Sequence, residues 1–258
     1  MKKTASDKLS DRLVKAFLKN KIISPLPSRY TKKLIEADKF RKICESKINL
    51  PIIGFKAGGT ALAVMKKLKE KEPFYASVYK RNLLKNGSTI SKNRSTLGIE
   101  LEVSYLIKKE FFNYKKIITK KNINKFISHI APSIELVGYR QKKKGIKSFG
   151  DLCSDFGGNI KFVLGKKKKY KKINIRNCKT VIENLNHKHK TFGNTNTVYI
   201  NPLNSLRFVL NKLKKDKIIL DKDFYVFTGS TVGVVPIVGK GLYVGNINKV
   251  GNVKAYIK

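Results

Sequence analysis

Two glutamates stand two residues apart in an apolar segment of this 258-residue chain, at Glu100 and Glu102. The residues around them alternate, with apolar side chains at Ile99, Leu101, Val103, Tyr105 and Ile107. This alternation predicts a β-strand, in which both carboxylates project from one face about 7 Å apart. Two carboxylates on one face repel each other unless a cation lies between them. The pair is therefore a candidate clamp for a hard metal ion, and a solvated strand face is the alternative interpretation.

A third acidic residue, Glu135, lies in the short apolar segment 132–138, which also predicts a strand. Acidic residues are scarce in this chain, which has 17 Asp and Glu against 57 Lys and Arg. A carboxylate embedded in an apolar strand therefore adds weight to the glutamate pair. Three oxygen ligands without His or Cys favour Mg²⁺ or Mn²⁺ over zinc.

A lysine, Lys56, lies in the glycine-rich segment GFKAGGT at residues 54–60, between a predicted strand and a predicted helix. Glycine lets the backbone approach a ligand closely, and a corner between a strand and a helix leaves N–H groups that can bind an anion. The segment is a candidate binding corner with one cationic side chain. An ordinary turn is the alternative.

The secondary-structure elements that position these residues are predicted to be mainly helical near the N-terminus. The spacing of apolar residues predicts helices at 6–19 and 31–46, a strand at 50–55, and a return to helix at 61–70. The sequence contains no internal repeat and no long flexible linker. We therefore expect an α+β protein, with a helical N-terminal portion at residues 1–70 packed on a β-rich domain at residues 71–258.

The β-rich part consists of short β-branched and aromatic runs separated by Gly, Asn and Lys. Apolar residues after an Asn-Pro start predict that one helix, 203–215, interrupts it. The runs predict strands at 97–107, 132–138, 159–164, 196–200, 224–228, 232–237, 241–245 and 252–257.

The formal charge of +40 raises nucleic-acid binding as a second class of function, because clustered cations release counterions from phosphate. The cations are 49 Lys and 8 Arg, whereas sites that bind phosphate or guanine specifically favour the planar fork of Arg. Lysines occur along the whole chain, from Lys2 to Lys258, together with many Asn and Ile. The codon bias of an AT-rich genome would produce this composition. The content of 41% hydrophobic and 10% aromatic residues indicates a globular protein rather than a disordered polycation.

The densest basic run is KKKKYKK at residues 166–172, between the strand-like segment 159–164 and the alternating segment 172–175. A solvated hairpin loop explains the run as well as an RNA-binding tract does. In both cases we expect the basic surface to bind polyanions nonspecifically, in a manner that depends on salt.

Cysteine, histidine and hydropathy argue against other classes of protein. The cysteines at 44, 153 and 178 form no CxxC motif and lie far along the chain from the three histidines, so neither a disulfide framework nor a zinc module is supported. No run approaches the ~18 apolar residues of a membrane span, and the start MKKTASD lacks the apolar core of a signal peptide. We expect reduced thiols, no membrane association and a cytoplasmic protein.

The order of several segments resembles the fumarylacetoacetate hydrolase superfamily, in particular its branch of 2-keto-4-pentenoate hydratases and 4-oxalocrotonate decarboxylases. The resemblance extends from about Thr31 to the C-terminus, in the family's order and with near-family spacing. It implies a helical N-terminal portion packed on a mixed β-roll of that family's C-terminal type, assembled as a homo-oligomer. It rests on the segments GFKAGGT, IELEVSYLI, APSIELVGYR, CSDFGGNIKFVLG, NPLNSLRFVLNKL and YVFTGSTVGVVPIVGKG.

The resemblance also implies a cofactor and roles for individual residues. The family's metal ligands fall on the three glutamates already singled out, so that Mg²⁺ or Mn²⁺ is the expected cofactor. Its active-site lysine falls on Lys56. Asp155 keeps the acid of a further family motif and is a candidate for proton transfer or for orienting Lys56, with a turn residue as the alternative. The residues implied to bind substrate are Arg140, Thr228, Gly229 and Ser230.

This chain departs from the family pattern at several positions. Gly138 and Tyr139 stand where the family has Asp-Ser, Phe156 stands where it has Asn, and Lys240 stands where it has Asp. Tyr139 and Phe156 leave the shape of the substrate pocket open, whereas the metal ligands are intact.

The implied activity is that of a metal-dependent, hydratase-like lyase that adds water to a small unsaturated 2-oxo or 2-hydroxy acid of the 2-hydroxypenta-2,4-dienoate type. Such an acid chelates a divalent ion through its carboxylate and keto oxygens, and the metal stabilises the enolate formed when a proton moves at the adjacent carbon. Decarboxylation and tautomerisation use the same enolate, so a 2-oxo acid decarboxylase or tautomerase is an alternative on the same fold. A non-catalytic, basic nucleic-acid-associated protein is the alternative from another class.

Overall fold

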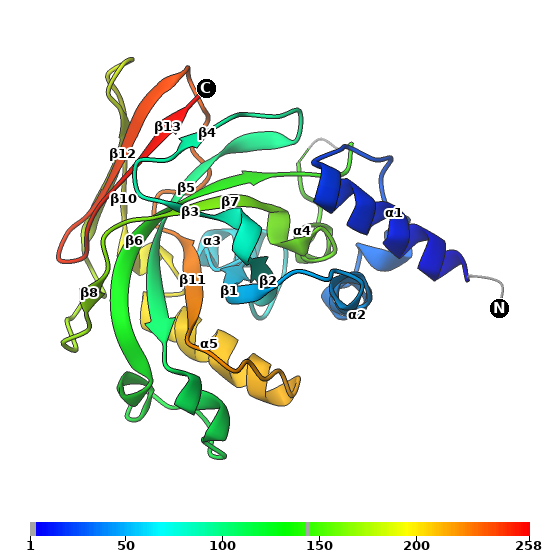
Figure 1. Ribbon diagram of the computed structural model, residues 1–258, viewed down its shortest axis with the longest axis horizontal. Coiled ribbons are helices and arrows are strands. Elements are labelled where there is room, and N and C mark those ends of the chain that lie inside the picture. The colour runs from blue at the N-terminus through cyan, green and yellow to red at the C-terminus, as the bar shows by residue number, and fades with distance from the viewer. Residues whose placement is uncertain (1–3, 143–144) are drawn as a thin grey trace.

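The computed structural model describes residues 4–142 and 145–258, and this part of the chain contains two β-sheets and five α-helices (Figure 1). The larger, eight-stranded sheet has the order β2-β1-β11-β5-β6-β7-β3, with β8 paired to β6. Its strands are β1 (Ile52–Gly58), β2 (Phe74–Tyr79), β3 (Leu83–Lys85), β5 (Thr96–Ile107), β6 (Ile127–Gly138), β7 (Asn159–Leu164), β8 (Lys168–Lys169) and β11 (Phe224–Ser230).

The smaller, five-stranded sheet has the order β10-β9-β12-β13-β4. Figure 1 shows it on the left, beside the curved strands β5 and β6. Its strands are β4 (Thr89–Ile90), β9 (Lys179–Asn184), β10 (His189–Asn194), β12 (Gly241–Ile247) and β13 (Gly251–Ile257). The helices are α1 (Ala5–Lys19), α2 (Leu34–Ser46), α3 (Leu62–Lys67), α4 (Phe149–Cys153) and α5 (Pro202–Lys215).

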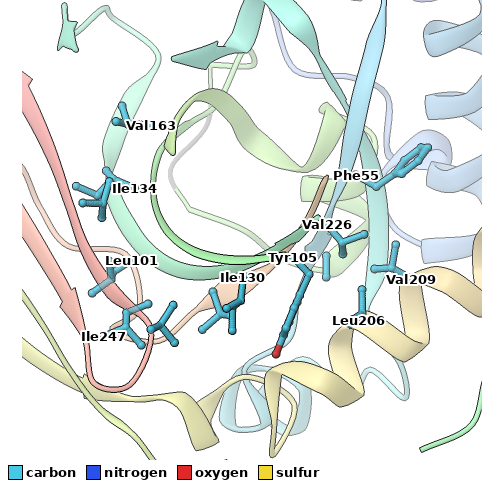
Figure 2. Packing of buried hydrophobic residues seen from close by; sticks show 14 of the residues in the cluster. Phe55, Leu101, Tyr105, Ile130, Ile134, Val163, Leu206, Val209, Val226 and Ile247 are labelled. Carbon is cyan, nitrogen blue, oxygen red and sulfur yellow. The ribbon is translucent and has the colours of Figure 1, made fainter. Parts of the chain in front are cut away.

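The main core lies between the larger sheet, the smaller sheet and α5. In Figure 2, Leu206 and Val209 of α5 face Phe55 and Val226, which lie on the parallel pair β1 and β11. The same figure shows Leu101 of β5 and Ile134 of β6 on the side where Ile247 of the smaller sheet packs. All these side chains are buried, so the apolar face of the larger sheet is covered along its length.

The N-terminal helices form a second apolar cluster against β2. Thr4 caps α1 through a reciprocal capping box with Asp7, which fixes where the helix begins. On α1, Phe17 packs against Tyr79 of β2 and against Phe156, with ring centroids 5.4 and 4.7 Å away. Among the described residues, no helix is long and apolar enough to cross a membrane.

Most of the predicted elements are present. The helices predicted at 6–19 and 203–215 are α1 and α5 within a residue or two, and α2 begins three residues later than predicted because Lys33, not Thr31, occupies the N-cap position. The strands predicted at 50–55, 97–107, 132–138, 159–164, 224–228, 241–245 and 252–257 correspond to β1, β5, β6, β7, β11, β12 and β13.

Three predictions of local structure are wrong. Residues 196–200 form the end of a 3₁₀ helix, a single bridge between Val198 and Ala61, and a turn instead of a strand. Residues 232–237 likewise make a single bridge, Val235 with Ile99, instead of a strand. The basic run 166–172 is not a hairpin loop between strands, because β8 lies within it and pairs with His129 and Ile130 of β6. The domain boundary at residue 70 stays a prediction; β1 and β2, on either side of it, pair in one sheet.

Candidate active site and metal centre

Three glutamates meet on β5 and β6. These strands are antiparallel neighbours, and their register places Glu100 directly opposite Glu135, and Glu102 opposite Ser133. Each glutamate offers a carboxylate oxygen, and these oxygens lie within 4.8 Å of one another. Glu102 and Glu135 are fully buried, and Glu100 is partly exposed. Like charges opposite one another destabilise a sheet unless a cation compensates them, so this arrangement calls for one.

Lys56 of β1 supplies one positive charge to the three glutamates. Its Nζ donates to both carboxylate oxygens of Glu135, at 2.6 and 2.7 Å, and to the Gly157 carbonyl at 3.1 Å. Strands β11 and β5 separate β1 from β6 in the sheet order, so the curl of the sheet is what brings these two side chains together. Lys56 is itself buried, at 4% exposed.

The charges at this centre do not balance without a further cation. When all three carboxyl groups are ionised, the single ammonium leaves two negative charges in a buried region, and burial accordingly raises the pKa of Glu100 and of Glu135. Burial raises the pKa of Glu102 to about 7, although the Lys56 charge opposes the shift. Neither carboxylate oxygen of Glu102 accepts a hydrogen bond of ordinary geometry from the described residues. The excess charge and the open oxygens fit a divalent cation bound by oxygen ligands.

The protonation of Lys56 follows from the same charges. Burial alone would lower the pKa of Lys56, but the neighbouring carboxylates of Glu135, Glu100 and Glu102 outweigh it and raise the pKa above its ordinary value. In this arrangement Lys56 is a cation and a hydrogen-bond donor rather than a free base.

A cavity of about 560 Å³ opens beside this centre. Lys56 and Glu100 line it, together with Gly157, Gly229 and Ser230. Much of the remaining wall is apolar, including Leu62, Val64, Leu97, Phe149, Phe192 and Val234. A concave apolar site with few polar groups at one place is typical of a small-molecule site.

The segment Thr228–Ser230 is divided between scaffold and cavity. The Thr228 hydroxyl is buried and donates to the Val103 carbonyl at 2.8 Å, and this residue is not part of the cavity wall. Gly229 has a φ of +106°, and a Cβ there would lie 2.0 Å from Thr60 Oγ1, so glycine is required. Gly229 and Ser230 are on the wall, where the Ser230 hydroxyl donates to the Gly233 carbonyl.

Arg140 and Asp155 form a buried pair behind the cavity. Arg140 Nη1 lies 3.2 Å from Asp155 Oδ1, and the Arg140 backbone N–H donates to Asp155 Oδ2 at 2.7 Å. The guanidinium also donates to the Asn159 carbonyl, and it lies over the ring of Phe17 at 4.8 Å. Neither Arg140 nor Asp155 lines the cavity. The structure therefore joins these two predicted site residues to each other and not to Lys56.

Phe156 and Tyr139, the two bulky residues at which the chain departs from the family pattern, lie in different surroundings. Phe156 has a φ of +53°, is fully buried and packs against Phe17 of α1, so its ring belongs to the helical cluster and not to the cavity. Tyr139 does line the cavity, and burial raises its pKa to about 12. Sequence reasoning also missed the Gly157 carbonyl, the third partner of Lys56, because a backbone acceptor has no sequence signature.

Solved structures share this architecture. 4-Oxalocrotonate decarboxylase from Pseudomonas putida G7, complexed with magnesium and adipate, matches with a TM-score of 0.81 and 18% identity over 97% of this chain and 96% of that chain. Fumarylpyruvate hydrolase from Pseudomonas aeruginosa, in complex with Mn²⁺ and pyruvate, matches with a TM-score of 0.60 and 11% identity over 82% and 91% of the two chains. The chain has the fold of these enzymes.

A third structure with this fold is 5-carboxymethyl-2-hydroxymuconate delta-isomerase from Mycobacterium smegmatis, with a TM-score of 0.56 and 12% identity over 81% of this chain and 79% of that chain. No family model matches the chain, and no curated protein matches it in sequence. These matches confirm the resemblance to the fumarylacetoacetate hydrolase superfamily at the level of the fold. One of the solved proteins with this fold is described by that family name.

Proposed function

We propose that this chain is a divalent-metal-dependent lyase that acts on a 2-oxo acid, with hydration of a 2-hydroxypenta-2,4-dienoate-type substrate as the reaction. One observation carries the proposal: three glutamate carboxyl groups cluster around a buried lysine, and both Glu100 of this cluster and the lysine lie on the wall of an apolar cavity. The fold supports it, because solved proteins of this fold are a decarboxylase, a hydrolase and an isomerase.

Glu100, Glu102 and Glu135 are the proposed ligands of Mg²⁺ or Mn²⁺. Two proteins of this fold were solved with magnesium and with Mn²⁺. When bound, the metal would act as a Lewis acid on the carboxylate and 2-oxo oxygens of the substrate. Glu100 is both part of the cluster and part of the cavity wall, so it marks where substrate and metal would meet.

Lys56 is the proposed catalytic residue of the chain itself. Its ammonium lies on the cavity wall and already donates three hydrogen bonds, to Glu135 and Gly157. The ammonium charge stabilises negative charge that develops on a bound 2-oxo acid. When one N–H turns from Glu135 to the substrate, Lys56 can deliver that proton to the adjacent carbon, and the proton released by the added water restores the ammonium. Gly229 and Ser230, also on the wall, are the proposed contacts of the substrate carboxylate.

Arg140 and Asp155 are proposed positioning residues. They pair at the start of the turn that contains Gly157, and the Gly158 backbone N–H donates to the Asp155 carbonyl. The pair thus fixes the turn whose Gly157 carbonyl accepts from Lys56. In this role Asp155 orients Lys56 through the backbone and does not transfer a proton.

Decarboxylation of a 2-oxo acid is the second candidate reaction. The observation in its favour is the match to 4-oxalocrotonate decarboxylase, which covers nearly all of both chains, whereas the hydrolase and the isomerase match about four fifths of this chain. The same carboxylates and lysine would serve both reactions.

The test follows the ultraviolet absorbance of 2-hydroxypenta-2,4-dienoate with protein and Mg²⁺, beside EDTA and Glu100→Gln. The hydratase predicts loss of absorbance, uptake of one water into a 4-hydroxy-2-oxo acid, and no loss in either control. Release of CO₂ from 2-oxohex-3-enedioate without hydration would identify a decarboxylase instead. Binding of RNA that Glu100→Gln leaves unchanged, with neither reaction present, would support the nucleic-acid alternative.

A further inference from the structure

Exposed apolar side chains gather at one place on this strongly charged protein. Five of them, between 37% and 73% exposed, line the cavity that holds Lys56 and Glu100. They come from α3, β5, β10 and the segment after β11, which are far apart in the sequence. A concave surface lined by several exposed apolar side chains is typical of a binding site. The five, which we call the apolar wall, are Leu62, Val64, Leu97, Phe192 and Val234.

The apolar wall is attached directly to the elements that carry the reactive groups. Leu62 and Val64 follow the glycine-rich segment 54–60 that contains Lys56, and Leu97 lies on β5, the strand of Glu100. The segment with Val234 is tied to the same strand, since Val235 and Ile99 exchange two backbone hydrogen bonds at 2.9 and 2.8 Å. A molecule held by its polar end at Lys56 and Glu100 would therefore meet apolar side chains along its remaining length.

The lining of the cavity contains far fewer cationic side chains than the rest of the molecule. The chain has 57 Lys and Arg, yet among the described residues that line the cavity the only cation is Lys56. Lys56 already contacts Glu135. A second carboxylate on the substrate would lose hydration in the cavity without gaining a second cation there, since the other polar side chains of the lining, including Tyr139, Asn196 and Thr197, are neutral apart from Glu100.

The size of the cavity exceeds what a five-carbon substrate needs. 2-Hydroxypenta-2,4-dienoate has eight non-hydrogen atoms, which occupy roughly 240 Å³ if each takes about the volume of one water molecule in the liquid, about 30 Å³. The cavity measures about 560 Å³. Roughly half of it therefore remains for further carbon atoms.

We propose that the substrate is a monocarboxylic 2-oxo acid whose chain extends beyond five carbons as an apolar tail, and that the apolar wall binds this tail. This inference rests on the proposed function, because the 2-oxo acid end binds at Lys56 and the three glutamates. It narrows the substrate class from small 2-oxo acids in general to those with one charged end and one hydrocarbon end.

The test measures binding, by calorimetry of the full-length protein with Mg²⁺, of 2-oxopentanoate, 2-oxooctanoate and the matched dicarboxylate 2-oxooctanedioate. Burial of three further CH₂ groups predicts that 2-oxooctanoate binds at least 20-fold more tightly than 2-oxopentanoate. The dicarboxylate is expected to bind no more tightly than 2-oxopentanoate. Equal affinities of the two monocarboxylates, or tighter binding of the dicarboxylate, would overturn the inference while leaving the proposed function intact.

Variants separate the wall from the reactive end. Leu97→Asn and Val234→Asn are expected to lower the ratio of 2-oxooctanoate to 2-oxopentanoate affinity at least fivefold. The matched control, Ile219→Asn, changes an apolar residue that is 75% exposed and outside the cavity, and it should leave the ratio unchanged.

If no 2-oxo acid binds the wild-type protein with Mg²⁺, the proposed function and this inference both fail. If Leu97→Asn dissociates an oligomer in sedimentation and leaves the ratio unchanged, the wall is a contact between copies and the inference is overturned.

Discussion

Lys56 on β1 donates hydrogen bonds to both carboxylate oxygens of Glu135 on β6, across a sheet in which two other strands separate them. Both side chains are buried, and Glu100 and Glu102 lie beside them. One lysine cannot neutralise three ionised carboxylates, so the cluster needs either protons or a further cation. This relationship links the fold, the cation and the chemistry.

Lys56→Met keeps the length of the side chain and removes its charge. We expect turnover to fall at least about 100-fold, because the proton donor and the positive charge at the cavity wall are lost. Mn²⁺ should bind more tightly, since no ammonium then competes for Glu135. Steady-state kinetics and Mn²⁺ titration measure the two effects, with Lys212→Met, in a partly exposed ion pair with Glu72, as the control. Unchanged turnover would exclude Lys56 from the reaction.

The affinity for the metal should rise with pH. Burial holds the pKa of Glu102 at about 7 without the metal, so that Glu102 is mostly protonated at pH 6 and mostly ionised at pH 8. A metal ion binds only the ionised form and releases the proton. Titration of this group alone makes binding about tenfold tighter at pH 8 than at pH 6. Calorimetry in buffers of different ionisation enthalpy counts the protons released, and an absence of proton release at pH 6 would contradict the prediction.

The stability of the metal-free protein should depend on pH in the opposite direction. A carboxyl group whose pKa is raised in the folded state binds its proton more tightly there than in the unfolded chain. Its stabilising contribution is therefore complete below about pH 4.5 and is lost as the pH rises through about 7. Glu102→Gln cannot ionise, so its melting temperature in EDTA should exceed that of the wild type at pH 8 and approach it at pH 5. A difference that does not change with pH would show that Glu102 does not titrate in this range.

The Arg140–Asp155 pair gives a test of whether Asp155 positions or transfers a proton. Asp155→Ala leaves a buried guanidinium without its carboxylate and should lower the free energy of unfolding by about 3–5 kcal/mol. The double variant Arg140→Met/Asp155→Leu should regain most of this loss in urea denaturation. If Asp155→Asn keeps full stability but has no activity, Asp155 acts in proton transfer and the positioning role is wrong.

The sequence predicts well those elements whose periodicity is visible in a single segment. Helix α5 has its apolar side chains at helical spacing behind an Asn201 cap, and β5 alternates strictly around Glu100 and Glu102. The sequence does not indicate β2, the edge strand beside β1, because all six of its side chains are buried and the strand has no alternation to detect. The apolar run 232–237 resembles a strand, but Gly233 and Pro236 interrupt it and a single bridge forms.

The residues of the site also differ in how far the sequence alone predicts their positions. The three glutamates and Lys56 are identified by residue type and order, and the structure brings them together. Arg140 and Asp155 show the limit, because only tertiary structure reveals that they pair with each other behind the cavity. The direction of Phe156 likewise depends on a left-handed backbone conformation and on Phe17 of α1, which no local pattern indicates. The apolar wall comes from four separate segments and has no linear signature.

The most direct test of the central claim is titration of the metal-free protein with Mn²⁺ at pH 8, with free Mn²⁺ followed by electron paramagnetic resonance. The three carboxylates predict one bound ion per chain. Glu102→Gln should weaken binding at least about 100-fold, because it replaces a charged carboxylate ligand by a neutral amide. The control Glu183→Gln alters a glutamate that pairs with Lys190 in the smaller sheet and should bind as the wild type does. No bound Mn²⁺, or equal affinity in wild type and Glu102→Gln, would contradict the assignment of this cluster as a metal centre.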